Sequence, residues 1–297
     1  MNVKKLLTLG VLLVLGGMAV AQPGQVVSSG FAGQVNQVRV MSFNIRYGLA
    51  DDGADSWPLR QDLVVRTIRD FEPQLLGVQE CLDFQGQVLR DSLPGYGFVG
   101  VGRDDGKLQG EMCGVFWQES FFEKLDAGHF WLSPEPDEVG SVGWDAALTR
   151  MATWVKLRTR TGDPVTFVFC NTHFDHVGQQ ARRESARIIH TQLKKVAGKL
   201  AVILVGDFNA PADPAADGPY HFLVKTRGWQ DTYRRVREPA LDEGTFNGFR
   251  GETGGARIDW ILTRPDLGVV SAGIVRAERE GRYPSDHFPV TATIELR

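Results

Sequence analysis

The fold is decided by the stretch LAVILVGDFN at residues 200–209, in which an apolar run ends in a carboxylate and an amide. Successive apolar residues bounded by polar ones are typical of a buried strand. Residues 165–170 form a similar run that ends at Asn171. Between the two runs, residues 180–196 place apolar side chains at helical spacing. We therefore predict a strand–helix–strand unit over residues 165–207.

Residues 38–80 repeat this plan. A strand-like run ends at Asn44, a helix pattern follows, and a second apolar run ends at Glu80. Asn44 precedes Glu80 by 36 residues, and Asn171 precedes Asp207 by 36 residues. The equal spacing indicates an internal duplication, in which each half places an amide and a carboxylate at neighbouring strand ends.

The rest of the chain adds strands more than helices. Residues 96–151 are rich in glycine and aromatic residues, which predicts short strands joined by long loops. Residues 258–262 and 289–295 have strand patterns as well. The fold class expected from these segments is α/β, a two-sheet sandwich with helices outside.

The N-terminus has the pattern of a secretory signal peptide. Lys4 and Lys5 precede an apolar run at 6–20 that is broken by glycines and closes on Ala-Val-Ala. This run is shorter than the ~20 residues of a membrane-spanning helix, so we expect cleavage after Ala21 and no stable membrane insertion afterwards. The expected organisation is a signal peptide at 1–21, a flexible lead-in at 22–37 and one domain at 38–297, secreted or periplasmic.

The net charge and the cysteine content limit the classes of function that the chain can have. The formal net charge of the chain is −3, and loss of Lys4 and Lys5 with the signal peptide makes it −5. A broad basic surface for duplex DNA is therefore not expected, although a local basic cleft stays open. Cysteines at 81, 113 and 170 are odd in number, and the last two lie in apolar runs, where they resemble small buried hydrophobic residues.

Six short segments place polar residues after an apolar strand: FNIR (43–46), QE (79–80), NTHFDH (171–176), GDFN (206–209), RIDW (257–260) and SDHFPV (285–290). One strand-end aspartate alone is usually a turn former, but an ordered set is far less common by chance. If these strand ends meet at one edge, they bring together Glu80, Asp207, Asp259, Asp286, His173 and His287. Carboxylates with neutral amides suit Mg²⁺ or Mn²⁺, and histidines can donate to a phosphoryl oxygen or leaving group. Phosphoester hydrolysis needs those parts.

In this order, the six motifs resemble those of the endonuclease/exonuclease/phosphatase superfamily, which includes pancreatic-type deoxyribonuclease, abasic-site endonuclease, bacterial sphingomyelinase, inositol polyphosphate 5-phosphatase and nocturnin-like deadenylases. The resemblance spans residues 43–290. It implies a DNase I-like, four-layered α/β sandwich, with two mostly antiparallel sheets packed face to face and helices outside. It also implies Mg²⁺ or Mn²⁺ as cofactor and in-line attack of water at phosphorus.

The resemblance further implies roles for the matching positions. Glu80 is expected as the principal metal ligand, with Asn44 and Asp286 close to the metal or its waters. Asp207 is expected to orient or deprotonate the attacking water, and Asn209 to hold that water and the phosphate. The expected phosphate contacts are His287, which Asp259 orients, and His173, which has Asn171 beside it.

Further residues outside the shared motifs are candidates for substrate binding: Arg46, Arg103, Trp144, Arg150, His176 and Arg182. Arg103, Arg150 and Arg182 could clamp a second phosphate or an anionic sugar substituent, with a structural ion pair as the equal alternative for each. Trp144 could stack on a base or sugar, or pack in the core.

The expected function is hydrolysis of a phosphorylated small molecule or a compact phosphodiester by a monomer. A secreted nuclease acting on DNA or RNA and a sphingomyelinase-type phospholipase C are the alternatives within the class. A catalytically silent binding module is the rival outside it, and such a protein would be expected to lose Glu80, Asp207 or His287, all of which are present.

Overall fold

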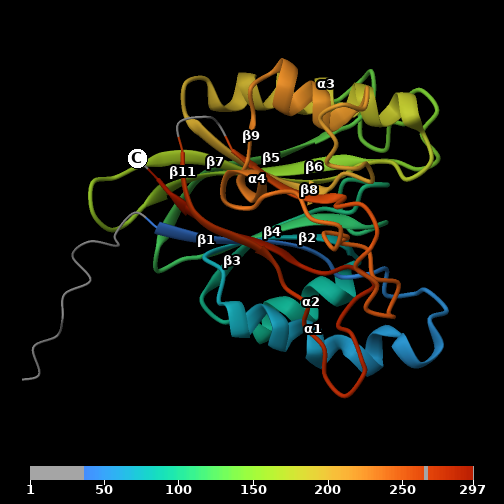
Figure 1. Cartoon of the computed structure of the whole chain (residues 1–297). Coiled ribbons are helices and arrows are strands. Elements are labelled where there is room, and N and C mark those ends of the chain that lie inside the picture. Colours follow the sequence, from blue (N-terminus) through green and yellow to red (C-terminus); the bar gives the residue numbers. More distant parts are fainter. Residues whose placement is uncertain (1–36, 264–266, 297) are drawn as a thin grey trace, which may run out of the picture. The chain divides into compact units, whose positions relative to one another are not determined.

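The computed structural model describes residues 37–263 and 267–296. The predicted signal peptide and residues 22–36 of the predicted lead-in lie outside the described residues. Within the described part, two six-stranded sheets lie face to face between outer helices (Figure 1). Among these residues no helix is both long and apolar enough to cross a membrane.

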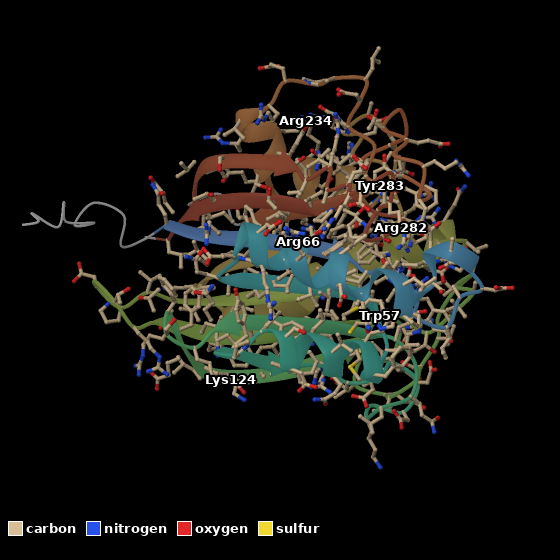
Figure 2. All side chains as sticks on the ribbon, turned by 90° about the horizontal axis from the view of Figure 1, so that it is seen from below. Trp57, Arg66, Lys124, Arg234, Arg282 and Tyr283 are labelled. Atoms are coloured by element: carbon tan, nitrogen blue, oxygen red, sulfur yellow. The ribbon has the colours of Figure 1, made fainter. Side chains whose placement is uncertain are left out.

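The first sheet contains both ends of the described chain. Its strands are β1 (Gln37–Asn44), β2 (Leu75–Cys81), β3 (Tyr96–Val99), β4 (Met112–Gln118), β11 (Gly268–Ile274) and β12 (Val290–Glu295). They lie in the order β11-β12-β1-β2-β4-β3, and only β1 and β2 are parallel. Helices α1 (Trp57–Phe71) and α2 (Asp83–Ser92) cover the outer face of this sheet. Seen from below, α1 begins at Trp57 and carries Arg66 on its outer surface (Figure 2).

The second sheet is built on the same plan. Its strands are β5 (Phe122–Trp131), β6 (Met151–Thr159), β7 (Thr166–His173), β8 (Ala201–Asp207), β9 (Gln230–Asp231) and β10 (Asp259–Thr263). They lie in the order β5-β6-β7-β8-β10-β9, with β7 and β8 as the parallel pair. Helix α3 (Gln179–Ala197) covers the outer face. Shorter elements are the 3₁₀ helix η1 (Gly53–Asp55), the π-helix η2 (His221–Thr226) and α4 (Thr232–Val236).

The predicted duplication is present as two β–α–β units. One unit is β1-α1-β2 and the other is β7-α3-β8, and each supplies the central parallel pair of its sheet. The predicted helix at 180–196 extends by one residue at each end in α3. The four-layered sandwich with mostly antiparallel sheets is confirmed. All three cysteines are free and buried.

The two sheets lie in close contact at Gly77 on β2. A Cβ atom at Gly77 would lie 2.5 Å from Cγ2 of Val205 and 2.9 Å from Cγ of Asn171, so only glycine fits. Asn171 crosses this gap and donates from Nδ2 to the carbonyl oxygens of Val78 and Gly114, at 2.8 Å each. The apolar core lies on both sides of this contact, between the sheets and beneath the outer helices.

Candidate active site

Three residues at the ends of central strands have left-handed backbone conformations. They are Arg46 after β1 (φ 61°), Glu80 near the end of β2 (φ 57°) and Asn209 after β8 (φ 46°). The pairing of β2 with β4 also shifts register at this point. Left-handed non-glycine residues and bulges cost free energy and concentrate at functional sites, where they redirect side chains. Here they turn side chains from both sheets toward one edge of the sandwich.

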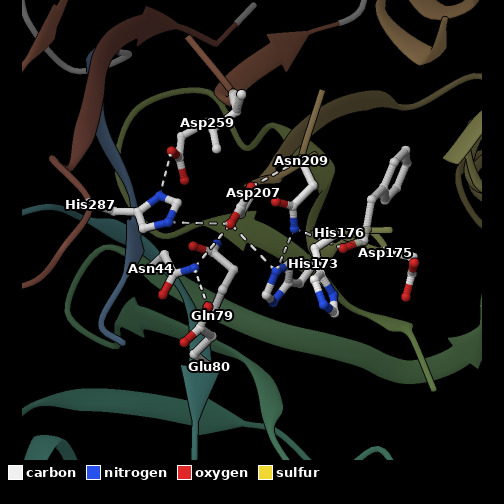
Figure 3. Close-up of polar contacts among 12 residues, drawn as sticks. Asn44, Gln79, Glu80, His173, Asp175, His176, Asp207, Asn209, Asp259 and His287 are labelled. Atoms are coloured by element: carbon white, nitrogen blue, oxygen red, sulfur yellow. Dashed lines mark hydrogen bonds and ion pairs between the residues drawn. The ribbon is translucent and has the colours of Figure 1, made fainter. Parts of the chain in front are cut away.

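Asn44 joins two carboxylates from opposite sheets at this edge (Figure 3). Its Nδ2 donates to Oε1 of Glu80 at 2.9 Å and to Oδ2 of Asp207 at 3.0 Å. Its Oδ1 accepts from the backbone N–H of Arg46. Asn44 therefore bridges and orients the two carboxylates through Nδ2, and its Oδ1 keeps a second lone pair beside the contact with Arg46. That Asn44 lies close to the metal stays a prediction.

Asp259 holds His287 in place, and Asp207 lies between His287 and His173 (Figure 3). Nδ1 of His287 lies 2.9 Å from Oδ2 of Asp259, and Nε2 of His287 lies 3.8 Å from Oδ2 of Asp207. Burial alone would lower the pKa of His287, but the charges of Asp259 and Asp207 and the hydrogen bond to Asp259 together raise it well above its usual range. The ring is thus a cation at neutral pH, with Nε2–H as a donor.

His173 has the opposite state. Asn209 donates from Nδ2 to Nε2 of His173 at 3.0 Å and to the carbonyl of Phe174, which fixes the amide orientation. Burial, followed by the charges of Arg150 and Arg103, lowers the pKa of His173 well below its usual range. His173 is therefore neutral and carries its proton on Nδ1, which has no hydrogen-bond partner among the residues that the structure describes.

Burial disfavours the charged form of two carboxylates at this edge. Burial, followed by the charge of Asp259, raises the pKa of Asp207 to about 7. Burial also raises the pKa of Asp286, whose Oδ2 lies 3.5 Å from Nη1 of Arg46. Buried carboxylates that shift in this way favour a nearby cation.

The residues present fit a hard divalent cation. One ligand atom from each of Glu80, His173 and Asp207 lies within 4.8 Å of the others. A second such group, Asp207, Asp259 and His287, is a weaker candidate because a protonated His287 cannot act as a ligand. Carboxylate oxygens from Glu80, Asp207 and Asp286 are the donors that Mg²⁺ and Mn²⁺ prefer.

These groups open into a cavity of about 930 Å³. Its lining includes nine of the predicted site residues: Arg46, Glu80, Arg150, His173, His176, Asp207, Asn209, Asp286 and His287. Asn44 and Asp259 lie directly behind this lining. The edge predicted from strand ends is therefore a real meeting point of both sheets.

Four predicted substrate-binding residues lie outside the cavity lining. Asn171 is buried between the sheets, where all its contacts are structural. Arg103 is occupied by a bidentate ion pair with Glu111 at 2.8 and 3.0 Å. Arg182 donates to the carbonyl of Asp175 behind the cavity wall. Trp144 is half-buried and also does not reach the cavity. We therefore expect none of the four to contact substrate directly.

The cavity also has lining residues to which no role was assigned from the sequence, among them Tyr47, Glu111, Leu148, Phe246 and the segment 252–256. Tyr47 donates its backbone N–H to Oε2 of Glu80 at 2.7 Å. Phe246 packs edge-on against His287, with ring centroids 5.3 Å apart. The position of Glu111 could have been predicted from the sequence. It directly precedes β4, and an antiparallel strand begins at the edge where its partner β2 ends.

The sandwich and the polar edge define a protein of the DNase I-like class. The chain belongs to the endonuclease/exonuclease/phosphatase family, whose model matches residues 41–287. Members of this family are phosphoester hydrolases, typically dependent on a divalent metal.

Solved structures and curated proteins agree with this assignment. A family protein from Bacteroides vulgatus is 39% identical, with a TM-score of 0.81, over 88% of this chain and 99% of that one. A mannosyl-6-phosphatase from Bacteroides thetaiotaomicron is 36% identical, with a TM-score of 0.79, over 87% and 100%. A carbon catabolite repressor protein 4 homologue from Arabidopsis thaliana is 27% identical over 57% of this chain, but only 37% of its own length is covered.

Proposed function

We propose that this protein is a divalent-metal-dependent phosphatase acting on a small phosphorylated molecule. The observation that carries the proposal is the convergence of Asp207, His287 and Glu80 on one side of a cavity about 930 Å³ in volume. A cavity of this size suits a ligand no larger than a small drug molecule. The similarity to a mannosyl-6-phosphatase over nearly the whole described chain supports a sugar phosphate as the first substrate class to test.

In the proposed reaction, Asp207 accepts a proton from the attacking water. Its Oδ1 accepts from the backbone N–H of Asn209 at 2.9 Å, which leaves Oδ2 facing the two histidines. His287 donates from Nε2 to a phosphoryl oxygen, and Asp259 positions its ring through Nδ1. His173 lines the opposite side of the cavity from His287 relative to Asp207 and contacts the phosphate there.

Glu80 and Asp286 would hold the metal, with Asn44 close to it, and for this metal we propose Mg²⁺ or Mn²⁺. When bound, the ion neutralises negative charge on the phosphoryl oxygens and the departing group. Asn44 and the backbone N–H of Tyr47 keep the Glu80 carboxylate in place for it.

A phosphodiesterase acting on nucleic acid is the second candidate. The family to which the chain belongs includes endonucleases and exonucleases, which favours testing it. The negative formal charge of the chain weighs against a broad nucleic-acid surface. We further propose that the protein acts outside the cytoplasm, on the basis of the leader pattern at residues 1–21. That it acts as a monomer stays a prediction.

A substrate panel tests the proposal. Phosphate release from sugar phosphates and other phosphomonoesters is measured with Mg²⁺ or Mn²⁺, beside plasmid nicking and oligonucleotide degradation. We expect phosphate release that disappears in folded Glu80→Ala and His287→Ala variants. Hydrolysis of nucleic acid without phosphomonoester turnover would replace the proposal with the second candidate.

A further inference from the structure

One wall of the cavity is a loop docked onto the start of α3. Two aspartates join this loop, residues 144–150, to the start of the helix. One lies in the loop and accepts from the helix backbone, and the other lies just before the helix and accepts from the loop backbone. Asp145 accepts from the backbone N–H groups of Gln180 and Ala181 at 3.2 and 2.7 Å. In return, Oδ2 of Asp175 accepts from the backbone N–H groups of Ala147 and Leu148 at 3.1 and 3.2 Å. The wall is therefore rigidly built.

Asp175 is also saturated on its other oxygen. Its Oδ1 accepts from the backbone N–H groups of Val177 and Gly178 at 2.9 and 2.7 Å. A side chain at Gly178 would bring its Cβ within 2.5 Å of the carbonyl oxygen of Asp145, so the loop and helix start meet backbone to backbone. Four backbone donors share the single charge of Asp175.

Arg150 lies within this wall and is poorly compensated. It is only 5% exposed, and its ion-pair contact within 4 Å, to Oδ2 of Asp175, is 3.7 Å long and not a hydrogen bond. Its Nε and Nη1 have no hydrogen-bond partner in the described structure. A buried guanidinium in this state is costly unless an anion nearby completes its environment. Arg150 lines the cavity that holds the proposed phosphate site.

His176 lies beside Arg150 and extends this wall toward the cavity. Nη2 of Arg150 lies 3.1 Å from Nδ1 of His176. Arginine has donors only, so Nδ1 accepts and the imidazole proton sits on Nε2. His176 is exposed and lines the cavity three residues after His173, from the same end of β7 (Figure 3). The Nε2–H group of His176 can therefore donate a hydrogen bond to a ligand oxygen.

We infer that Arg150 and His176 form a subsite that selects a phosphomonoester dianion over a phosphodiester. This inference rests on the proposed phosphatase function and names its substrate class. A phosphomonoester carries nearly two negative charges at neutral pH, whereas a diester carries one and replaces a terminal oxygen with an ester substituent. A buried, partly compensated cation interacts more strongly with the dianion, and Nε2–H of His176 supplies a donor for a terminal oxygen.

The test compares a monoester with a diester in matched variants. Steady-state kcat/KM is measured with 4-nitrophenyl phosphate and bis(4-nitrophenyl) phosphate in Mn²⁺, for the wild type, Arg150→Met, Arg150→Lys and His176→Ala. Arg182→Met is the control, because it removes a cation from the outer side of the same turn. Loss of this buried positive charge predicts at least a ~10-fold lower monoester kcat/KM in Arg150→Met, with less than a ~3-fold change for the diester.

Further outcomes distinguish a failure of the Arg150–His176 subsite from a failure of the proposed phosphatase function. Arg150→Lys should recover part of the monoester preference, His176→Ala should reduce it, and Arg182→Met should leave it unchanged. If Arg150→Met does not fold, Arg150→Lys and the exposed His176→Ala carry the comparison. Equal losses on both substrates, or none, would overturn the subsite while leaving the phosphatase standing. A wild type that hydrolyses neither ester with metal would remove the proposed function itself.

Discussion

The substitution Asp259→Asn isolates the role of the buried pair behind the cavity. It preserves the size of the side chain and removes the charge that faces Nδ1 of His287. The two side chains are 1% and 6% exposed, so solvent screens their 2.9 Å contact very little. Oδ1 of Asp259 has no hydrogen-bond partner among the described residues, and the carboxylate therefore acts through His287.

These contacts set the magnitude. A hydrogen bond between charged groups contributes about 1.5–3 kcal/mol, and about 1.4 kcal/mol corresponds to a tenfold change in rate. If the contact is expressed fully in the transition state, kcat should fall about 10- to 150-fold in Asp259→Asn. An interaction made only in the transition state lowers kcat and kcat/KM together, so KM should change little.

The assay is steady-state hydrolysis of 4-nitrophenyl phosphate, with circular dichroism to establish that the variant is folded. Asp242→Asn serves as the matched control, because that carboxylate pairs with Arg276 at the surface and is 60% exposed. A folded Asp259→Asn variant with kcat within about threefold of the wild type would refute the reasoning, because a buried charged contact is worth more than that.

Three further predictions concern the metal and the frame around the site. Treatment with EDTA should stop phosphate release and Mg²⁺ or Mn²⁺ should restore it; activity that survives exhaustive chelation would exclude the metal. Gly77→Ala should lower the free energy of unfolding by about 1–3 kcal/mol, because its Cβ would meet Val205 at 2.5 Å; an unchanged urea midpoint would argue against close sheet contact. Arg60→Met should cost about 3 kcal/mol or more, since the buried Arg60 donates to the carbonyls of Ile45 and Pro284 at 2.6 and 3.0 Å; a loss below about 1 kcal/mol in urea denaturation would contradict this.

The strand ends were predictable because each half of the chain repeats one pattern. Apolar runs that end in Asn44, Glu80, Asn171 and Asp207 locate the two parallel pairs, and the carboxyl ends of parallel strands share one edge. That regularity is enough to place Glu80 and Asp207 in one site. It also accounts for α3, whose apolar positions recur over many turns.

Depth along a strand was not predictable from the motif. Asn171 and His173 are two residues apart and face the same side of β7. His173 is the last residue of β7 and reaches the cavity, whereas Asn171 lies two residues earlier in the strand and joins the two sheets. A linear motif shows the shared face but not where the neighbouring sheet ends.

The ion-pair and hydrogen-bond partners of the arginines could not be predicted from the sequence either. Arg103, Arg150 and Arg182 are equivalent as sequence signals, but only Arg150 lines the cavity. Arg103 forms an ion pair with Glu111, which lies eight residues away across a turn. Helix α2 was also not anticipated, because its ten residues include a glycine and bury few side chains, so its pattern is weak.

The most direct test of the central claim is phosphate release by Asp207→Asn in saturating Mn²⁺, compared with the wild type on the same phosphomonoester. The substitution keeps the side-chain shape but removes the proposed acceptor for the proton of water. General-base catalysis contributes about 10²- to 10⁴-fold, so the account predicts a folded variant with kcat at least ~100-fold lower. A folded Asp207→Asn enzyme that retains turnover close to the wild type would contradict it.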